Sequence, residues 1–140
     1  MRDETQVDVL IVGGRPAGAS LAARLGARGL RVAIVDRAAF PSAPSVPSCP
    51  VIYPHTMRML DDLGVPEADY AEPGAKTSAL AIAFHGRFQQ LMRMPVVHGR
   101  DYLYGIDRSR FDHVLWKNLA RFPSVTARER FALTDLVRDG

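Results

Sequence analysis

The sequence predicts an α/β fold in which helices flank a parallel sheet. Three observations in the first 36 residues support this prediction: two short, β-branched and almost wholly apolar segments, residues 7–12 and 31–36, and an amphipathic segment between them that begins at Ala17. Short apolar runs rich in Val and Ile are typical of buried parallel strands. Strand, helix and strand in this order form a βαβ unit, because a crossover is needed to join parallel strands.

The helix within this unit has an apolar face and a basic face. Its apolar face is predicted to carry Leu21, Ala22 and Leu25, whereas Arg24 and Arg28 fall on the opposite side. Gly29 follows as a plausible helix stop, because glycine readily adopts the left-handed backbone that ends many helices.

Residues 38–106 are predicted to form a loop, a short helix and a β-hairpin. The loop over 38–54 is rich in proline, which favours extended backbone. A short helix follows, with Met57, Leu60 and Leu63 on one side. Residues 78–94 have the pattern of a β-hairpin whose turn lies at His85-Gly86. Residues 102–106 are predicted to form another strand.

Residues 107–140 are predicted to form a helix and a strand pair. Apolar residues at helical spacing predict the helix, and Ser109 with Asp112 suggests a capping box at its start. Residues 124–128 and 131–137 then have the pattern of two strands, and Asp139-Gly140 is a typical hairpin turn pair. We therefore expect the chain to stop within a hairpin, as a piece of a longer protein.

Composition and charge exclude several classes of function. The net charge of +3 comes almost wholly from arginine, without a basic run interleaved with aromatic residues, so no nucleic-acid partner is expected. The polar start lacks a signal peptide's apolar core, and the early apolar stretch is too short to cross a bilayer, so we expect a cytoplasmic protein. Cys49 is alone, which precludes an internal disulfide.

No metal site and no catalytic residue can be assigned from the sequence. The four histidines have no metal-like spacing to one another or to Cys49. No nucleophile and base pair is visible, and no serine lies in an elbow motif. The catalytic residues therefore remain unknown, as do the oligomeric state and the substrate.

The segment Gly13-Gly14-Arg15-Pro16-Ala17-Gly18 carries the chemistry of this sequence. It has the first and last glycines of a G-x-G-x-x-G dinucleotide fingerprint, between a strand and a helix. Gly13 permits the turn, Gly18 lets the helix pack closely on the sheet, and the amides at the helix start attract a pyrophosphate. Asp36, 18 residues after Gly18, can accept hydrogen bonds from a ribose diol. These features predict a Rossmann-type domain that binds FAD or NAD(P).

Arg15 departs from the fingerprint, because it occupies the position of the second glycine. Three arrangements are open: the side chain points away from the cofactor, the phosphates sit slightly differently, or the guanidinium pairs with a phosphate.

Four segments together resemble the FAD-dependent monooxygenase family, the aromatic-hydroxylase group that is similar to geranylgeranyl reductases and flavin-dependent halogenases. The segments are residues 8–18 with 35–37, the short helix over 54–64, the Arg-x-x-Phe-Asp-x-x-Leu helix start over 108–115, and residues 125–140. The resemblance implies a flavoprotein oxidoreductase, and specifically a monooxygenase that hydroxylates a small organic substrate with NAD(P)H and O2. It also implies that 1–140 is a partial FAD-binding domain, with a βαβ unit over 1–37.

The resemblance assigns the cofactor contacts residue by residue. Asp36, where the family more often has Glu, would hold the adenosine ribose, Arg37 would lie by the adenine, and Arg108 would reach toward the flavin. The pyrophosphate would be contacted by the fingerprint residues Gly13, Gly14, Pro16, Ala17 and Gly18, with Arg15 among them.

The family's two later motifs, which contain Asp-Gly and Gly-Asp, have no place before Gly140. We therefore expect this piece alone to be inactive. Two alternatives stay open: a non-catalytic dinucleotide-binding module, and a fragment of an NAD-dependent dehydrogenase.

Overall fold

The computed structural model describes residues 6–45, 50–72 and 76–137. The chain divides into two compact units. Unit 1 contains residues 1–43 and 109–140, and unit 2 contains residues 44–108. Cys49 and the expected turn at Asp139-Gly140 lie outside the described residues.

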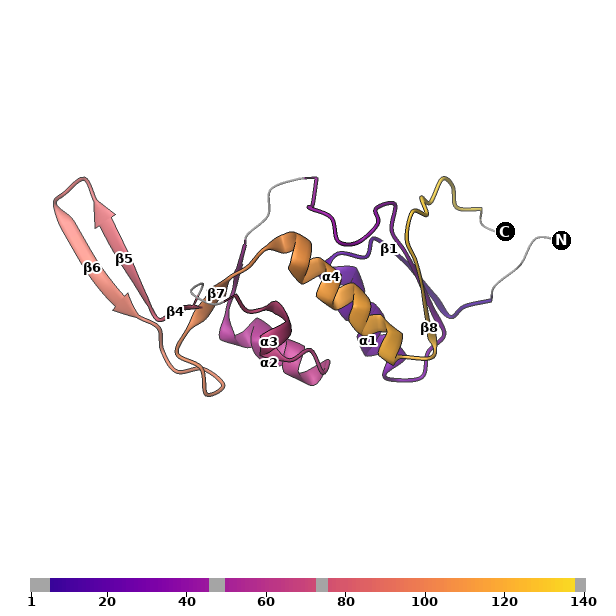
Figure 1. The fold of residues 1–140 in the computed structure, drawn as a ribbon, viewed down its shortest axis with the longest axis horizontal. Coiled ribbons are helices and arrows are strands. Elements are labelled where there is room, and N and C mark those ends of the chain that lie inside the picture. The colour runs from indigo at the N-terminus through magenta and orange to yellow at the C-terminus, as the bar shows by residue number, and fades with distance from the viewer. Residues whose placement is uncertain (1–5, 46–49, 73–75, 138–140) are drawn as a thin grey trace. The chain divides into compact units, whose positions relative to one another are not determined.

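Unit 1 contains a three-stranded parallel sheet. Strands β1 (Val9–Val12), β2 (Val32–Val35) and β8 (Val125–Arg128) lie in the order β1-β2-β8. Val32 of β2 is in register with Val9 of β1 and with Val125 of β8. Helix α1 (Pro16–Gly26) packs against all three strands (Figure 1). The predicted βαβ unit and parallel sheet are therefore confirmed.

The buried face of α1 is made of small residues. Ala19, Ala22 and Ala23 are almost completely buried, whereas Leu21 is 47% exposed. The prediction that Leu21 faces the core is therefore wrong. A face of alanines lets the helix axis approach the sheet closely, so the leucine is left on the outside. The helix ends at Gly26, and the chain turns at Gly29 with a φ of +79°, as predicted.

The predicted strand over 131–137 is absent, since these residues have no regular secondary structure. The backbone amides that follow β8 bind back toward the end of β2: Arg130 N donates to Ala38 O at 3.1 Å, and Phe131 N donates to Asp36 O at 2.9 Å. These bonds hold the chain beside β2. Strand β8 is therefore a third parallel strand of the sheet, and it has no hairpin partner in this segment.

Helix α4 (Arg108–Asn118) continues into the 3-10 turn η1 (Leu119–Arg121). Phe111, Leu115 and Leu119 are buried, as the helical spacing predicts. The expected capping box is wrong, because Ser109 lies within the helix instead of preceding it. Asp112 is instead fully buried, with none of its surface accessible.

Unit 2 holds a small antiparallel sheet and two short helices. The sheet has the order β3 (Val51–Ile52), β7 (Leu103–Gly105) and β4 (Lys76–Thr77). The helices are α2 (Pro54–Asp62) and α3 (Glu67–Tyr70). Met57, Leu60 and Leu63 are buried, which confirms the predicted apolar side of the short helix.

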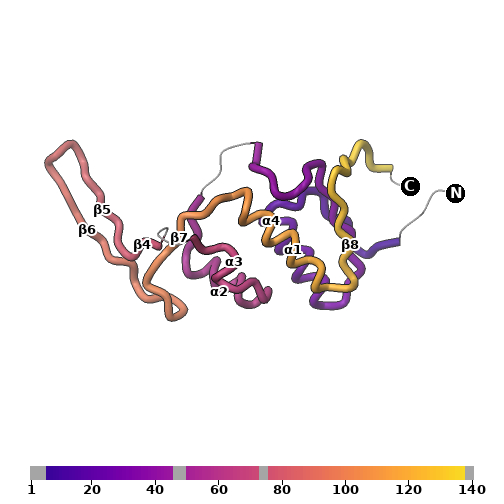
Figure 2. Tube along the Cα trace, viewed as in Figure 1, coloured from indigo at the N-terminus to yellow at the C-terminus, as the bar shows by residue number. Residues whose placement is uncertain are grey.

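A separate hairpin is formed by β5 (Ala79–Phe84) and β6 (Phe88–Arg93), as predicted (Figure 2). His85 and Gly86 both have positive φ, the backbone that tight hairpin turns require. Large apolar side chains alternate along one face, and Phe84 and Phe88 are 61% and 50% exposed. Within the described part of the chain, no third strand joins this hairpin.

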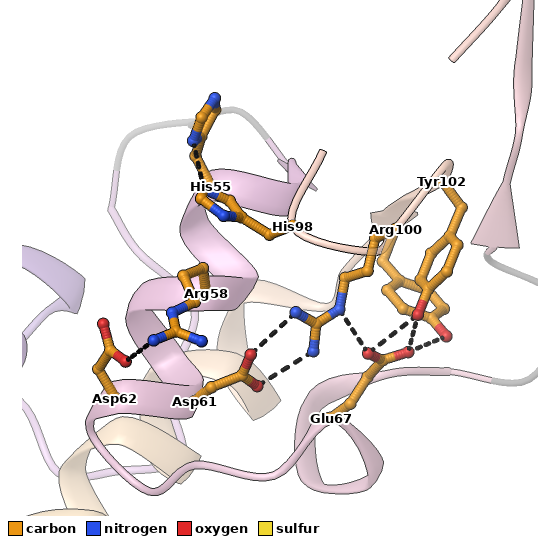
Figure 3. A network of polar contacts seen from close by, with 9 residues as sticks. His55, Arg58, Asp61, Asp62, Glu67, His98, Arg100 and Tyr102 are labelled. Carbon is orange, nitrogen blue, oxygen red and sulfur yellow. Dashed lines mark hydrogen bonds and ion pairs between the residues drawn. The ribbon is translucent and has the colours of Figure 1, made fainter. Parts of the chain in front are cut away.

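An ion-pair network ties the helices of unit 2 to β7 (Figure 3). Arg100 donates both terminal nitrogens to Asp61, at 2.8 and 3.1 Å, and its Nε to Glu67 at 3.1 Å. Glu67 also accepts hydrogen bonds from Tyr102 at 3.1 Å and from Tyr104 at 2.7 Å. Desolvation and the bond to Glu67 raise the pKa of Tyr104 to about 12, so the phenol stays a donor at neutral pH.

This network predicts an acid-sensitive contribution to stability. Burial raises the pKa of Glu67, but hydrogen bonds from Tyr104, Arg100 and Tyr102 together outweigh it, and the pKa falls below its ordinary value of 4.5. A depressed folded-state pKa stabilises the protein above the unfolded-state pKa, and this contribution is lost as the pH falls below 4.5 through the folded value. Glu67→Gln should therefore weaken the dependence of unfolding free energy on pH in this acidic range.

Urea unfolding followed by circular dichroism across this range checks the prediction. The exposed Asp69→Asn on the same helix is the matched control and should keep the wild-type pH dependence. An unchanged slope in Glu67→Gln would show that the network does not carry the effect. The pKa of Asp61 is also lowered by its bond to Arg100. The unfolding free energy of Glu67→Gln should therefore keep a weaker dependence on pH, which comes from Asp61.

Candidate cofactor-binding site

The fingerprint forms a tight turn between β1 and α1. Gly13 has a φ of +103°, a conformation that favours glycine, and its amide donates to Val35 O at 2.8 Å. A Cβ on Gly18 would overlap the carbonyl oxygen of Gly13. Gly18 is therefore required for the helix to begin this close to the turn, which is the packing role expected of the last glycine.

The first turn of α1 presents backbone amides without a side-chain cap. Arg15 is the N-cap residue, and its side chain makes no capping hydrogen bond. Pro16 occupies the first helical position, where its missing N–H costs little. The first turn contains no acidic residue. The partial positive charge of the helix start is therefore left for an anion from outside the helix.

Asp36 lies directly after β2, beside the turn, and is only 7% exposed. Its Oδ2 accepts a hydrogen bond from Gly14 N at 2.6 Å, and its Oδ1 accepts one from Ala38 N at 2.8 Å. Bonds from amides to a carboxylate are among the stronger hydrogen bonds in proteins. They hold the carboxylate in one orientation, and each oxygen keeps a further acceptor site.

A cavity of about 310 Å³ opens beside this carboxylate. It lies at the carboxyl ends of β1 and β2, where ligands bind in open α/β sheets. Its walls come from the fingerprint, from the end of β2 and from the segment after β8: Val12, Gly13, Val35, Asp36, Arg37, Phe131, Ala132 and Leu133.

The side chain of Arg15 is held by protein groups. One terminal nitrogen donates to Asp112 Oδ2 at 2.9 Å and to Ser42 O at 2.5 Å. The other donates to Ser42 Oγ at 2.9 Å and to Ala43 O at 3.2 Å. The guanidinium also lies 4.9 Å from the centre of the Phe40 ring. Of the three arrangements considered for Arg15, this geometry corresponds to a side chain that points toward other parts of unit 1.

Gly14 packs against the ring of Trp116. A Cβ at Gly14 would overlap this ring, which is itself stacked on Phe40 with 4.8 Å between ring centres. Sequence reasoning gave Asp112 only a capping role and missed both its bond to Arg15 and the place of Trp116. The available signal was slight: Trp116 is the only tryptophan of the chain and follows Asp112 by one helical turn.

A family described as FAD binding domain matches residues 6–140. The chain belongs to this FAD-binding domain family. The expected resemblance is thereby confirmed, and the predicted α/β fold agrees with it. No curated protein shows significant similarity to the chain.

Solved structures of flavin enzymes share the fold of this FAD-binding domain. A myxobacterial FAD-dependent halogenase, CndH, superposes with a TM-score of 0.77 at 24% identity, over 96% of this chain and 31% of its own. PqsL of Pseudomonas aeruginosa, a probable FAD-dependent monooxygenase, gives 0.75 at 20%, over 96% and 36%. p-Nitrophenol 4-monooxygenase PnpA of Pseudomonas putida gives 0.71 at 22%, over 91% and 32%. The FAD-binding domain thus spans about a third of these proteins.

Arg37 and Arg108 are the two remaining residues of the FAD-binding domain for which a cofactor contact was predicted. Arg37 is exposed and lines the cavity. Arg108 opens α4 and belongs to unit 2, so its reach toward the flavin stays a prediction.

The histidines of the FAD-binding domain include one close pair that their spacing did not indicate. His55 Nδ1 lies 3.1 Å from His98 Nε2 (Figure 3). The described residues contain no group of three or more His, Cys, Asp or Glu side chains suited to a metal ion. Nor does any helix among them have the length and apolar character needed to cross a membrane.

Proposed function

We propose that this domain holds FAD with the pyrophosphate at the first turn of α1 and the adenosine ribose at Asp36. The observation that carries the proposal is the position of the Asp36 carboxylate. It is almost buried, oriented by two amides, and exposed toward a cavity that begins at the fingerprint turn.

The start of α1 fits a pyrophosphate. It offers the amides of Ala17 and Gly18 with no capping side chain and no acidic residue in the first turn. Pro16 fixes the backbone of the first turn without contributing a donor. Gly14 supports the site indirectly, since its amide is bonded to Asp36.

The cavity fits an adenosine. Asp36 has acceptor sites left for the two ribose hydroxyls, because a carboxylate offers about four. Phe131 and Leu133, which sequence reasoning did not include, supply apolar surface for the adenine ring, and Arg37 lies at the same cavity. FAD, when bound, would supply oxidation and reduction chemistry at its flavin ring.

For the whole protein we propose a cytoplasmic flavin-dependent monooxygenase acting on a small organic molecule with NAD(P)H and O2. Two similar folds are named as monooxygenases, which supports this choice. The flavin halogenase fold is the competing possibility. Oxygen uptake by the FAD-loaded enzyme on addition of NADH or NADPH is the test.

The cofactor placement predicts a specific pattern of competition. FAD should remain with the purified chain after desalting and should quench the fluorescence of Trp116, which packs against the fingerprint. ADP should displace FAD, because the site built by unit 1 holds the adenosine and pyrophosphate. FMN, which lacks the adenosine, should not displace it.

The competition experiment requires a folded chain, and circular dichroism of the same samples shows whether the chain is folded. A folded chain that retains no flavin and whose fluorescence responds neither to FAD nor to ADP would contradict the proposal. Displacement by FMN and not by ADP would place the flavin end of the cofactor, instead of the adenosine, in unit 1.

A further inference from the structure

Arg15, the residue that breaks the fingerprint, is bonded to two other segments of unit 1. Arg15 joins the loop after β2 through Ser42 and Ala43, and it joins α4 through Asp112. Ser42 and Asp112 are 27 and 97 residues away in the chain. All four hydrogen bonds come from one planar guanidinium, whose fork of donors suits several acceptors at once.

Helix α4 contacts the fingerprint through two residues one helical turn apart. Asp112 binds Arg15, and Trp116 fills the space that a side chain on Gly14 would need. Phe40 lies under the guanidinium and is stacked on Trp116. We call Arg15, Phe40, Ser42, Asp112 and Trp116 the Arg15 cluster.

The Arg15–Asp112 pair is costly to break. Asp112 has no accessible surface, and the side chain of Arg15 is 27% exposed. Removing the guanidinium takes a charged partner away from a carboxylate that has no accessible surface, which is costly, whereas replacing both residues by apolar residues of similar size is often tolerated. The pair therefore constrains where the fingerprint turn lies relative to α4.

We propose that Arg15 is a positioning residue for FAD: it fixes the fingerprint turn and the 40–43 loop against α4 before the cofactor binds, and it does not itself bind the pyrophosphate. This inference rests on the proposed FAD placement. It explains how a fingerprint with an arginine in a glycine position keeps its function. The side chain is used for internal bonding, and the phosphate contacts remain with the backbone of α1.

The test compares Arg15→Met, Arg15→Lys, Asp112→Asn and the double variant Arg15→Met/Asp112→Leu. Two quantities are measured: the FAD dissociation constant, and the emission wavelength of Trp116 without FAD. Arg15→Met should weaken FAD binding about tenfold or more and shift Trp116 emission to longer wavelength, because loss of the guanidinium lets water reach Asp112 and the neighbouring Phe40–Trp116 stack. The double variant should recover most of the affinity and the wild-type emission.

Arg15→Lys separates positioning from phosphate binding. A lysine keeps the positive charge but presents one compact head group, so it cannot hold Asp112, Ser42 and Ala43 together. It should therefore resemble Arg15→Met. Asp112→Asn should also weaken binding, although Asp112 has no accessible surface for contact with a ligand. Arg24→Met, on the exposed face of α1, is the control and should match wild type.

A phosphate contact would give the opposite pattern. Arg15→Lys would then keep most of the affinity, and the double variant would bind FAD as weakly as Arg15→Met despite wild-type emission; either result overturns the proposal. If Arg15→Met does not fold, Ser42→Ala takes its place. It removes only the Ser42 Oγ contact and should still weaken binding about twofold to fivefold.

Failure of the proposed function is recognised separately. A folded wild-type chain that binds no FAD contradicts the placement of the cofactor. The Arg15 cluster is then judged on the emission of the ligand-free variants alone. The Trp116 emission of Arg15→Met must shift to longer wavelength, and that of the double variant must stay at the wild-type wavelength. An unshifted Arg15→Met or a shifted double variant overturns the inference.

Discussion

Gly18→Ala is expected to lower the unfolding free energy of unit 1 by about 3 kcal/mol or more, the upper range for overpacking. The added methyl group would overlap the carbonyl oxygen of Gly13 and would lie 3.3 Å from Ile11 Cγ2. Because the overlapped atom belongs to the backbone of the turn, no side chain can rotate to relieve it. The turn or the start of α1 must move, and FAD binding should be lost with it.

Helix propensity alone predicts the opposite sign. Alanine within a helix is favoured over glycine by about 1 kcal/mol, so an unchanged or raised stability of Gly18→Ala would refute the steric argument. Urea unfolding followed by circular dichroism is the measurement. Gly86→Ala is the matched control: its Cβ meets nothing within 4 Å, so only its positive φ costs free energy, about 1 kcal/mol.

Asp36→Asn should affect stability and FAD affinity together. The carboxylate accepts one amide hydrogen bond at each oxygen, so an asparagine must turn its NH2 group toward either Gly14 N or Ala38 N. One amide then loses its acceptor and faces a donor, at a cost of about 2 kcal/mol in unfolding free energy. In the proposed placement of FAD the ribose hydroxyls would also lose a charged acceptor, and FAD should bind about tenfold more weakly or worse.

Parallel measurements of urea unfolding and FAD titration check this result. Asp135→Asn, an exposed aspartate in the same unit, should match wild type in both. An Asp36→Asn variant with lowered stability but unchanged FAD affinity would confine Asp36 to an internal role, and the ribose would have to bind elsewhere.

The parallel sheet was predictable because its signals are local. Residues 7–36 contain the two apolar strands, the glycine break and the helix, and the structure has all of them. The position of β8 in the sheet was harder to predict from the sequence, because its partner β2 lies about ninety residues earlier. Residues 131–137 have an apolar pattern typical of a strand, but the bonds from Arg130 and Phe131 to residues 36–38 direct the chain along the cavity.

The candidate site likewise contains residues that a local motif predicts and residues that only the folded structure brings together. Gly13, Gly18 and Asp36 could be named from the sequence because each has a fixed place in a known turn. The Arg15–Asp112 pair could not be predicted, because no periodicity relates residues separated by 97 positions. A buried aspartate within an apolar helix face was the one indirect sign, since such a charge requires a partner.

The β5–β6 hairpin has a practical consequence for the behaviour of this chain in solution. Its apolar side chains are exposed, and its strand edges are open within the described residues. Open edges with apolar side chains are where chains add to one another and aggregate. We therefore expect concentrated samples to self-associate through the hairpin, which lies far along the chain from the fingerprint. Flavin titrations belong at dilute protein, where scattering from associated chains does not distort the flavin absorption bands.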